Sequence, residues 1–226
     1  MTRLRILCIS DKIDPLIYSS NIKNRFNDID LVLSAGDLEL KYYGFIVSSL
    51  NKPLLFVFGN HNLKCMHRYR HKNDRYDVEK QGIITGFPPS YGSIYLGDRV
   101  KNIKSLLLAG LGGSMKYNNG PNQFSEFEMV LKIFKILPKL FFNRIFYGRW
   151  LDILLTHAPP RGLGDKEDRC HQGFKVFRTF LKYFKPRYLL HGHIHLYDIN
   201  APREIQFMET RIINIYEHQI IDIEVS

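Results

Sequence analysis

The chain has 226 residues, a length that favours a single domain, and its 45% hydrophobic, 13% aromatic and 24% charged residues exclude a disordered or fibrous protein. The formal net charge of +10 favours anionic partners, such as phosphorylated molecules, nucleic acid or an anionic membrane surface. The three cysteines lack paired spacing, so we expect no disulfide scaffold or cysteine zinc site, and a reducing compartment such as the cytoplasm.

Short apolar runs that end in polar or glycine residues predict strands buried on both faces. These runs are Leu4–Ser10, Leu31–Ser34, Leu54–Phe58, Ser105–Ala109, Ile153–Thr156 and Tyr188–Leu190. The helices expected between them are Ile22–Phe26, Leu40–Leu50, Ser125–Leu137 and Gly173–Phe184. No apolar run approaches the roughly 20 residues needed to cross a bilayer, so we expect no membrane span.

Strands that alternate with helices predict a layered α/β domain, and local strand pairs make its sheet mixed. The hairpins expected are Val100–Ile103 with Leu106–Leu108, and Arg211–Ile215 with Gln219–Ile223. No Pro/Gly/Ser linker marks a boundary, so residues 1–226 are predicted to form one domain.

Two segments look like insertions into this domain. Residues 64–80 are polar and basic, which is typical of a solvated loop and leaves nucleic-acid contact as an alternative. Residues 125–150 interleave aromatic with basic residues. We interpret them as an amphipathic helical pair whose aromatic side chains pack on the sheet, with an oligomer or membrane contact as the alternative.

Ionisable and amide side chains follow most of the predicted strands. They are Asp11, Asp37, Asn60, His61, His157, His193 and His195. Ligands of open α/β sheets bind at the carboxyl ends of the strands, so these residues are expected at one edge of one sheet. Each one alone also fits a turn or a strand end. Together they would be costly to bury without partners, and a bound metal would supply a partner to all of them.

Oxygen and imidazole ligands without a thiolate favour Mn, Fe, Zn or Co over Cu(I), Ca or Mg. A central carboxylate such as Asp37 can bridge two cations about 3.5–4 Å apart, between which a hydroxide forms and attacks phosphorus. An imidazole outside the coordination shell can protonate the leaving oxygen. The pattern therefore predicts two divalent metal ions.

In type, order and spacing these residues resemble the calcineurin-like metallophosphoesterase superfamily, in particular its small single-domain phosphodiesterases. The matching series is Asp11, Gly36-Asp37, Gly59-Asn60-His61, His157 and Gly192-His193-Ile194-His195. The resemblance implies a two-sheet mixed β-sandwich flanked by helices. It also implies that metal one is held by Asp11, Asp37 and His195. Metal two would be held by Asp37, Asn60, His157 and His193.

The resemblance gives His61 the role of the non-ligand histidine that assists the leaving group, and Asp37 that of the bridging carboxylate. The first motif of the family is Asp-x-His, whereas Ile13 stands here in the place of the histidine, so metal one is expected to be weak. Asp14 is a candidate to compensate, although its register differs from that of the missing ligand.

Two further residues are candidates for the pocket. Asn62 stands where an acidic residue usually follows Gly-Asn-His, so it is expected to affect only the support of the ligands. His171 either lines the pocket or is a helix-entry residue that faces solvent.

The leading functional prediction is a metal-dependent phosphoesterase that hydrolyses a diester, or a monoester, by attack of a metal-bound hydroxide. Its expected substrate is a phosphorylated small molecule, and manganese is among the expected metals. The alternatives are a degenerate binding module without turnover, favoured by Ile13, and a nuclease that uses residues 64–80.

Overall fold

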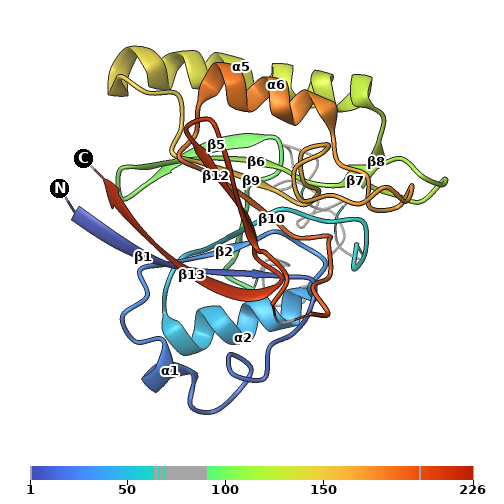
Figure 1. Ribbon diagram of the computed structural model, residues 1–226. Coiled ribbons are helices and arrows are strands. Elements are labelled where there is room, and N and C mark those ends of the chain that lie inside the picture. Colours follow the sequence, from blue (N-terminus) through green and yellow to red (C-terminus); the bar gives the residue numbers. More distant parts are fainter. Residues whose placement is uncertain (1, 64–65, 67–68, 70–90, 199, 226) are drawn as a thin grey trace, which may run out of the picture.

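The computed structural model describes residues 2–63, 66, 69, 91–198 and 200–225. Two mixed sheets lie face to face, and helices cover their outer faces (Figure 1). This architecture confirms the predicted two-sheet α/β sandwich. The predicted insertion at 64–80 lies outside the described residues apart from Met66 and Tyr69, and the nuclease hypothesis that depends on it stays a prediction.

The first sheet carries the N-terminal half of the site. Its strands, in spatial order, are β13 (Glu217–Val225), β1 (Thr2–Ser10), β2 (Leu31–Ser34), β3 (Leu54–Phe56) and β4 (Ile94–Tyr95). Strands β1 to β4 are parallel, whereas β13 is antiparallel to β1 along its whole length. The carboxyl ends of β1, β2 and β3 therefore lie at one edge of the sheet.

The second sheet carries the C-terminal half of the site. Its strands, in spatial order, are β11 (Glu204–Phe207), β12 (Thr210–Asn214), β10 (Tyr188–His191), β9 (Ile153–Thr156), β6 (Leu106–Leu111) and β5 (Arg99–Ile103). The four central strands are parallel and the two edge strands antiparallel. The antiparallel pair of β5 and β6 confirms the first predicted hairpin. A short ribbon of β7 (Ser114–Met115) and β8 (Gln123–Phe124) lies beside this sheet.

Helices close both outer faces. They are α1 (Ile22–Arg25) and α2 (Leu40–Leu50) on the first sheet, and α5 (Glu126–Tyr147) and α6 (Lys175–Phe184) on the second (Figure 1). In β1, Ile6 and Cys8 enter the core between the sheets, whereas Leu7 and Ile9 pack toward α1 and α2. Burial on both faces explains why the strand is a continuous apolar run.

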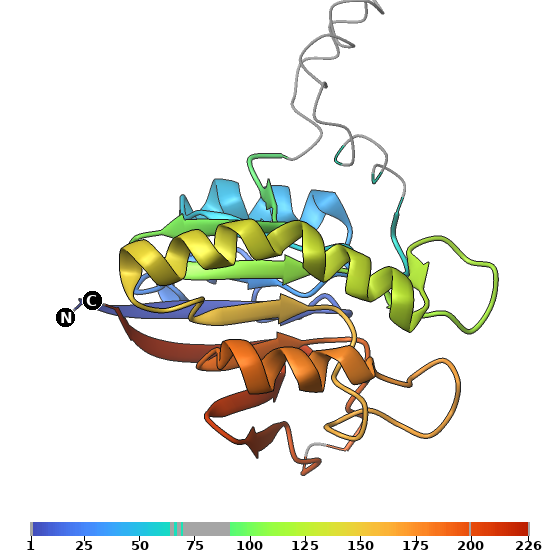
Figure 2. The ribbon, with the colours of Figure 1, turned by 90° about the horizontal axis from the view of Figure 1, so that it is seen from above.

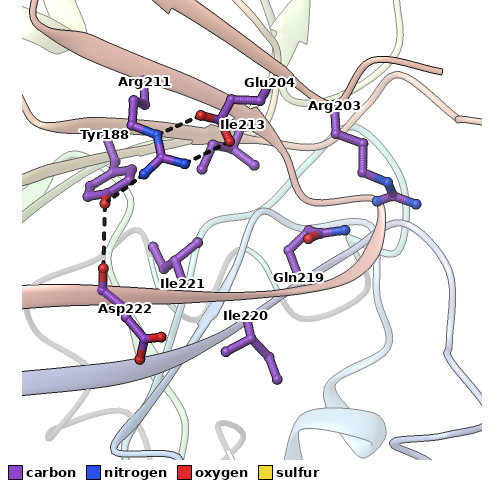
Figure 3. Close-up of a pocket in the computed structure, with 9 residues that line it drawn as sticks. All are labelled: Tyr188, Arg203, Glu204, Arg211, Ile213, Gln219, Ile220, Ile221 and Asp222. Atoms are coloured by element: carbon purple, nitrogen blue, oxygen red, sulfur yellow. Dashed lines mark hydrogen bonds and ion pairs between the residues drawn. The ribbon is translucent and has the colours of Figure 1, made fainter. Parts of the chain in front are cut away.

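The second predicted hairpin is wrong. Strand β12 pairs with β10 and β11 in one sheet, and β13 pairs with β1 in the other. The two strands separate around a pocket of about 300 Å³, where Arg211 forms hydrogen bonds with Glu204 and Tyr188 (Figure 3). Sequence alternation predicts which face of a strand is buried but not which strand pairs with it, and a short connection fits either arrangement.

The predicted helical pair in residues 125–150 is also wrong, because α5 continues through Pro138 as one helix of 22 residues. A capping box of Ser125 and Glu128 starts the helix, and Gly148 with φ of 71° ends it. Most of the aromatic side chains expected to pack on the sheet are exposed instead, among them Phe134 and Phe146. No helix in the described part of the chain is long and apolar enough to span a membrane.

Candidate metal centre

The predicted residues meet at one edge of the sandwich, but they come from two sheets and not from one as expected, because the carboxyl ends of both sets of parallel strands lie there. Asp11 follows β1, Asp37 follows β2 and Asn60 follows β3, while His157 follows β9 and His193 follows β10. The link between the two sheets is direct, since His157 Nε2 lies 3.3 Å from Asp37 Oδ2 and 3.0 Å from Asn60 Oδ1. The sandwich thus brings together residues that are more than 90 positions apart in the sequence.

Asp37 and His157 form the buried centre of the cluster. Burial alone would raise the pKa of Asp37, but the charge and hydrogen bond of His157, helped by the His61 N–H, lower this pKa to about 2. Burial alone would lower the pKa of His157, whereas Asp37 and then Asp11 raise it to about 9. The Nδ1 of His157 bonds the Ala35 carbonyl at 2.8 Å, so its Nε2 is the atom that faces the carboxylate.

Asp11 lies beside this pair. Its carboxylate is held by the backbone of His193, after the second sheet, and its own backbone by Gly36, after the first. The His193 N–H donates to both carboxylate oxygens of Asp11 at 3.0 Å, and the Asp11 N–H donates to the Gly36 carbonyl at 3.1 Å. Burial raises the pKa of Asp11; nearby His157 opposes this rise and Asp37 adds to it. Two neighbouring buried carboxylates raise the cost of ionising both in the absence of added positive charge.

The backbone is strained where it delivers these side chains. Asp11, Asp37 and His193 all have φ between 59° and 67°, a left-handed conformation that non-glycine residues seldom adopt. Such strain concentrates at functional sites, where the surrounding structure enforces it. Here the hydrogen bonds between Asp11 and the backbone of Gly36 and His193 hold two of these turns against each other.

Glycine is required at two points of the edge. A Cβ atom on Gly59 would lie 2.1 Å from Asp37 Oδ1 and 2.5 Å from His157 Cε1. A Cβ atom on Gly192 would lie 2.3 Å from Asp11 Oδ2. The glycines of the two motifs therefore allow the carboxylates to approach the neighbouring strand ends.

His193 and His195 differ in their surroundings. Burial and the charge of His157 lower the pKa of His193 to about 3, so this imidazole is neutral. Its Nε2 bonds the Cys170 carbonyl at 2.7 Å, which leaves Nδ1 with the free lone pair. His195 is 42% exposed at its side chain, lies 3.9 Å from Asp11 Oδ1 through Nε2, and bonds the Tyr197 hydroxyl.

Two residues that the sequence analysis missed support the loop after β3. Asn122 donates to the carbonyls of Phe58 and Gly59, and the Asn60 side chain donates to the Tyr117 hydroxyl at 3.3 Å. Both residues come from the β7–β8 ribbon region, which carries no family motif. A polar Asn-Asn-Gly-Pro-Asn stretch gives no signal beyond that of an ordinary turn.

The remaining candidates lie around the cluster. His61 is exposed and reaches Asp37 through its backbone N–H at 2.8 Å, while the Asn62 side chain donates to the Asp37 carbonyl at 2.8 Å. Ile13 is exposed. Both oxygens of Asp14 have hydrogen-bond partners, Oδ1 the Leu16 N–H and Oδ2 the His218 ring, and the role of Asp14 as a replacement ligand stays a prediction.

His171 lies next to the cluster. Its ring centre is 5.5 Å from that of His193, and its Nδ1 lies 2.7 Å from Asp168 Oδ1. Asp168, Cys170 and His171 place ligand atoms within 4.8 Å of one another. This loop therefore covers the His193 ring and adds polar atoms around it.

The donor set fits divalent cations. Asp11, Asp37 and His157 place one ligand atom each within 4.8 Å of one another. In the described ranges neither carboxylate has an ion pair with lysine or arginine, and their only ionic partners are His157 and His195. Buried carboxylates require a positive partner, and oxygen with imidazole donors suits Mn, Fe, Zn or Co.

Comparison with solved structures finds proteins with the same fold. A crystal structure of TT1561 of Thermus thermophilus matches with a TM-score of 0.61 at 14% identity, over 96% of this chain and 90% of that one. Another crystal structure matches over 100% of both chains, with a TM-score of 0.63 and 14% identity. At these identities the likeness shows the fold alone.

Two curated relatives come from Caenorhabditis elegans. The UPF0046 protein K07C11.7 is 25% identical over 206 residues, which is 85% of this chain and 63% of that protein. The UPF0046 protein T07D4.2 is 28% identical over 105 residues, which is 46% of this chain and 24% of that protein. The chain thus spans less than two thirds of the length of these relatives. The sequence profile of the calcineurin-like phosphoesterases matches residues 4–197, and the chain belongs to this family.

Proposed function

We propose that the protein hydrolyses a phosphodiester of a small molecule at the Asp11, Asp37 and His157 cluster, with divalent metal ions as cofactors. The observation that carries the proposal is the pair of buried carboxylates, Asp11 and Asp37, whose described ionic partners are histidines alone. A fixed cation such as lysine would neutralise this charge permanently. Imidazoles that can give up a proton suit a centre that loads a metal.

The proposed ligands form two unequal sets. Asp37, Asn60, His157 and His193 would hold one ion. His193 would use Nδ1, which its hydrogen bond to the Cys170 carbonyl leaves free, and His157 would use Nε2, which faces Asp37 and Asn60 and must first lose its proton. Asp11, Asp37 and His195 would hold the other. When bound, such ions act as Lewis acids on a phosphoryl oxygen and lower the pKa of water.

The chain itself would orient the substrate and move one proton. His61 is exposed beside the cluster, and its backbone N–H donates a hydrogen bond to the Asp37 carboxylate. We propose that its imidazole protonates the oxygen of the leaving group. Asn62 fixes the same loop by holding the Asp37 carbonyl, a supporting role for a residue that the sequence placed in the pocket. A cytoplasmic location stays a prediction.

The test is metal analysis coupled to hydrolysis of an aryl phosphodiester and the matching monoester. Protein treated with chelator is reloaded with Mn, Fe, Zn or Co, or left without metal. We expect hydrolysis only in the loaded samples, faster for the diester, and loss of both metal retention and hydrolysis in Asp37→Ala. The matched control is Asp222→Ala, a carboxylate that pairs with Arg3 at 2.8 Å.

A binding module without turnover is the second candidate, because Ile13 removes one potential ligand from the Asp11 set. Retained metal with no hydrolysis of either ester under any loading would favour this alternative over the enzyme. Full activity of Asp37→Ala would instead contradict the metal-centre assignment itself.

A further inference from the structure

Helix α5 has two apolar faces on opposite sides. The inner face packs on the second sheet and consists of Met129, Ile133, Ile136 and Leu140, all buried. At 3.6 residues per turn, a second set of apolar side chains falls within an arc of about 80° on the other side of the helix. This outer stripe is Phe127, Leu131, Phe134, Pro138, Phe141 and Ile145.

The outer stripe is exposed along its whole length. Ile145 is 76% exposed, Phe127 69% and Phe134 60%, and the neighbouring Phe146 is 65% exposed. Figure 2 shows α5 as the outermost element of its layer, with no other described segment over it. With a rise of 1.5 Å per residue, the stripe extends about 27 Å from Phe127 to Ile145. A continuous exposed apolar surface of this extent is unusual on a monomer and marks an interaction site.

Positive charges flank the outer stripe. Lys135 and Lys139 lie on one side of it and Arg144 on the other, and none of the three has an ion pair with a described residue. The acidic residues of α5 are both in its first turn and both engaged. Glu126 accepts from the backbone N–H groups of Lys175 and Val176, and Glu128 closes the capping box. Beyond this first turn the helix carries no carboxylate, so none lies beside Lys135, Lys139 or Arg144 on the helix.

Helix α6 lies beside α5 and extends this positive surface (Figure 1). It contains no acidic residue, and its exposed positions include Lys175, Arg178 and Lys182. The exposed Tyr183 adds an aromatic side chain to the same layer. The two helices together present aromatic and aliphatic side chains surrounded by cations.

We propose that this layer binds the surface of an anionic lipid bilayer, with the outer stripe of α5 inserted at the level of the headgroups. A helix with an apolar face rich in phenylalanine and flanking lysine and arginine is typical of interfacial membrane binding. A second copy of the chain would bring like charges together across the same stripe. A nucleic-acid backbone would match the cations but leave the phenylalanine side chains without an apolar partner.

The test is co-sedimentation of the full chain with vesicles of phosphatidylcholine alone or mixed with phosphatidylserine. We expect binding to the mixed vesicles, weak or no binding to the neutral ones, and weakening of the binding as salt rises from about 0.05 M to about 0.5 M. Trp150, the single tryptophan, packs against Phe141 and Phe184 and reports insertion through quenching by brominated lipid.

Substitutions separate the contribution of the positive charges to vesicle binding from that of the apolar side chains. Lys135→Gln with Lys139→Gln should weaken binding roughly 30-fold, since each lysine near an anionic surface is worth about fivefold. Phe134→Ser with Ile145→Ser should weaken it at least about tenfold per residue. The controls are Lys23→Gln with Lys41→Gln for charge, and Met208→Ser for an exposed apolar residue elsewhere. All of these side chains are exposed, and circular dichroism checks that each variant is folded.

Three results would overturn the proposal. The first is equal binding to neutral and anionic vesicles, and the second is equal weakening by the control variants. The third is a protein that ignores vesicles but is a dimer by light scattering, with Phe134→Ser and Ile145→Ser dissociating it. That result would assign the outer stripe to a second copy.

Discussion

Metal binding should release a proton from His157. The change of metal affinity with pH measures this release. Asp37 raises the pKa of His157 from 6.5 to about 9, so the metal-free imidazole is protonated at neutral pH. A ligand must give up this proton before its Nε2 can bind a cation. The raised pKa means that the charged form is favoured below pH 9 and lost above it, so metal affinity should increase with pH across this range.

The magnitude follows from the neutral fraction of His157. With a pKa of about 9, this fraction is about 1 in 100 at pH 7.0 and about 1 in 4 at pH 8.5. Affinity for the first ion should therefore rise about 25-fold between these values, with close to one proton released per ion at pH 7.0. His193 contributes no proton in this range, because its pKa of about 3 leaves it neutral.

The assay is calorimetric titration of chelator-treated protein with Mn in buffers of different ionisation enthalpy, which yields the number of protons released. His171→Gln is the control, since the Nδ1 of His171 pairs with Asp168 and its loss should leave the linkage unchanged. Affinity that is independent of pH from 7.0 to 8.5, with no proton release, would refute the assigned protonation of His157.

Three further predictions concern single residues of the site. His61→Gln should keep bound metal by elemental analysis, and should slow esters with poor leaving groups by about 10²–10⁴-fold more than activated aryl esters; equal losses would exclude the proton-donor role. Ile13→His should raise metal content toward two ions per chain and raise activity at low metal, whereas two ions retained by the unaltered protein after dialysis would contradict a weakened site. Gly59→Ala should lower metal affinity at least about tenfold, because its Cβ would lie 2.1 Å from Asp37 Oδ1. Gly148→Ala, whose Cβ would meet nothing within 4 Å, should leave metal affinity unchanged.

The sequence predicted the centre of the site because the parallel strands of each sheet share an edge for their carboxyl ends. This rule places Asp37 at the edge of the first sheet and His157 at the edge of the second, and the packing of the two sheets brings their atoms to 3.3 Å. The spacing of the motifs does not predict which ring nitrogen of a histidine faces the metal site. The bond from His193 to the Cys170 carbonyl depends on a loop between β9 and α6 that carries no pattern of its own.

Helix α5 shows why the sequence did not predict the exposed outer stripe. Proline in a helix interior costs about 3 kcal/mol, so Pro138 predicts a break. The inner face on both sides of Pro138, with Ile133 and Leu140, is buried against the second sheet, and this packing outweighs the lost hydrogen bond. Apolar residues on both faces of a helix usually indicate a buried helix. The sequence could not show that one of these faces has no covering element.

The two proposed ligand sets differ in rigidity, and this difference bears on the choice between enzyme and binding module. Asn60, His157 and His193 are buried and held by hydrogen bonds. His157 bonds the Asn60 side chain and the Ala35 carbonyl and lies 3.3 Å from Asp37, and His193 bonds the Cys170 carbonyl. On the other side of Asp37, His195 is 42% exposed at its side chain, and Ile13 offers no donor atom. A rigid set loses little entropy on binding an ion, whereas a mobile one must be ordered by the ion itself. Turnover that rises only after the first ion is bound would therefore place the chemistry at the second, weaker set. Turnover that saturates with the first ion would make the rigid set sufficient.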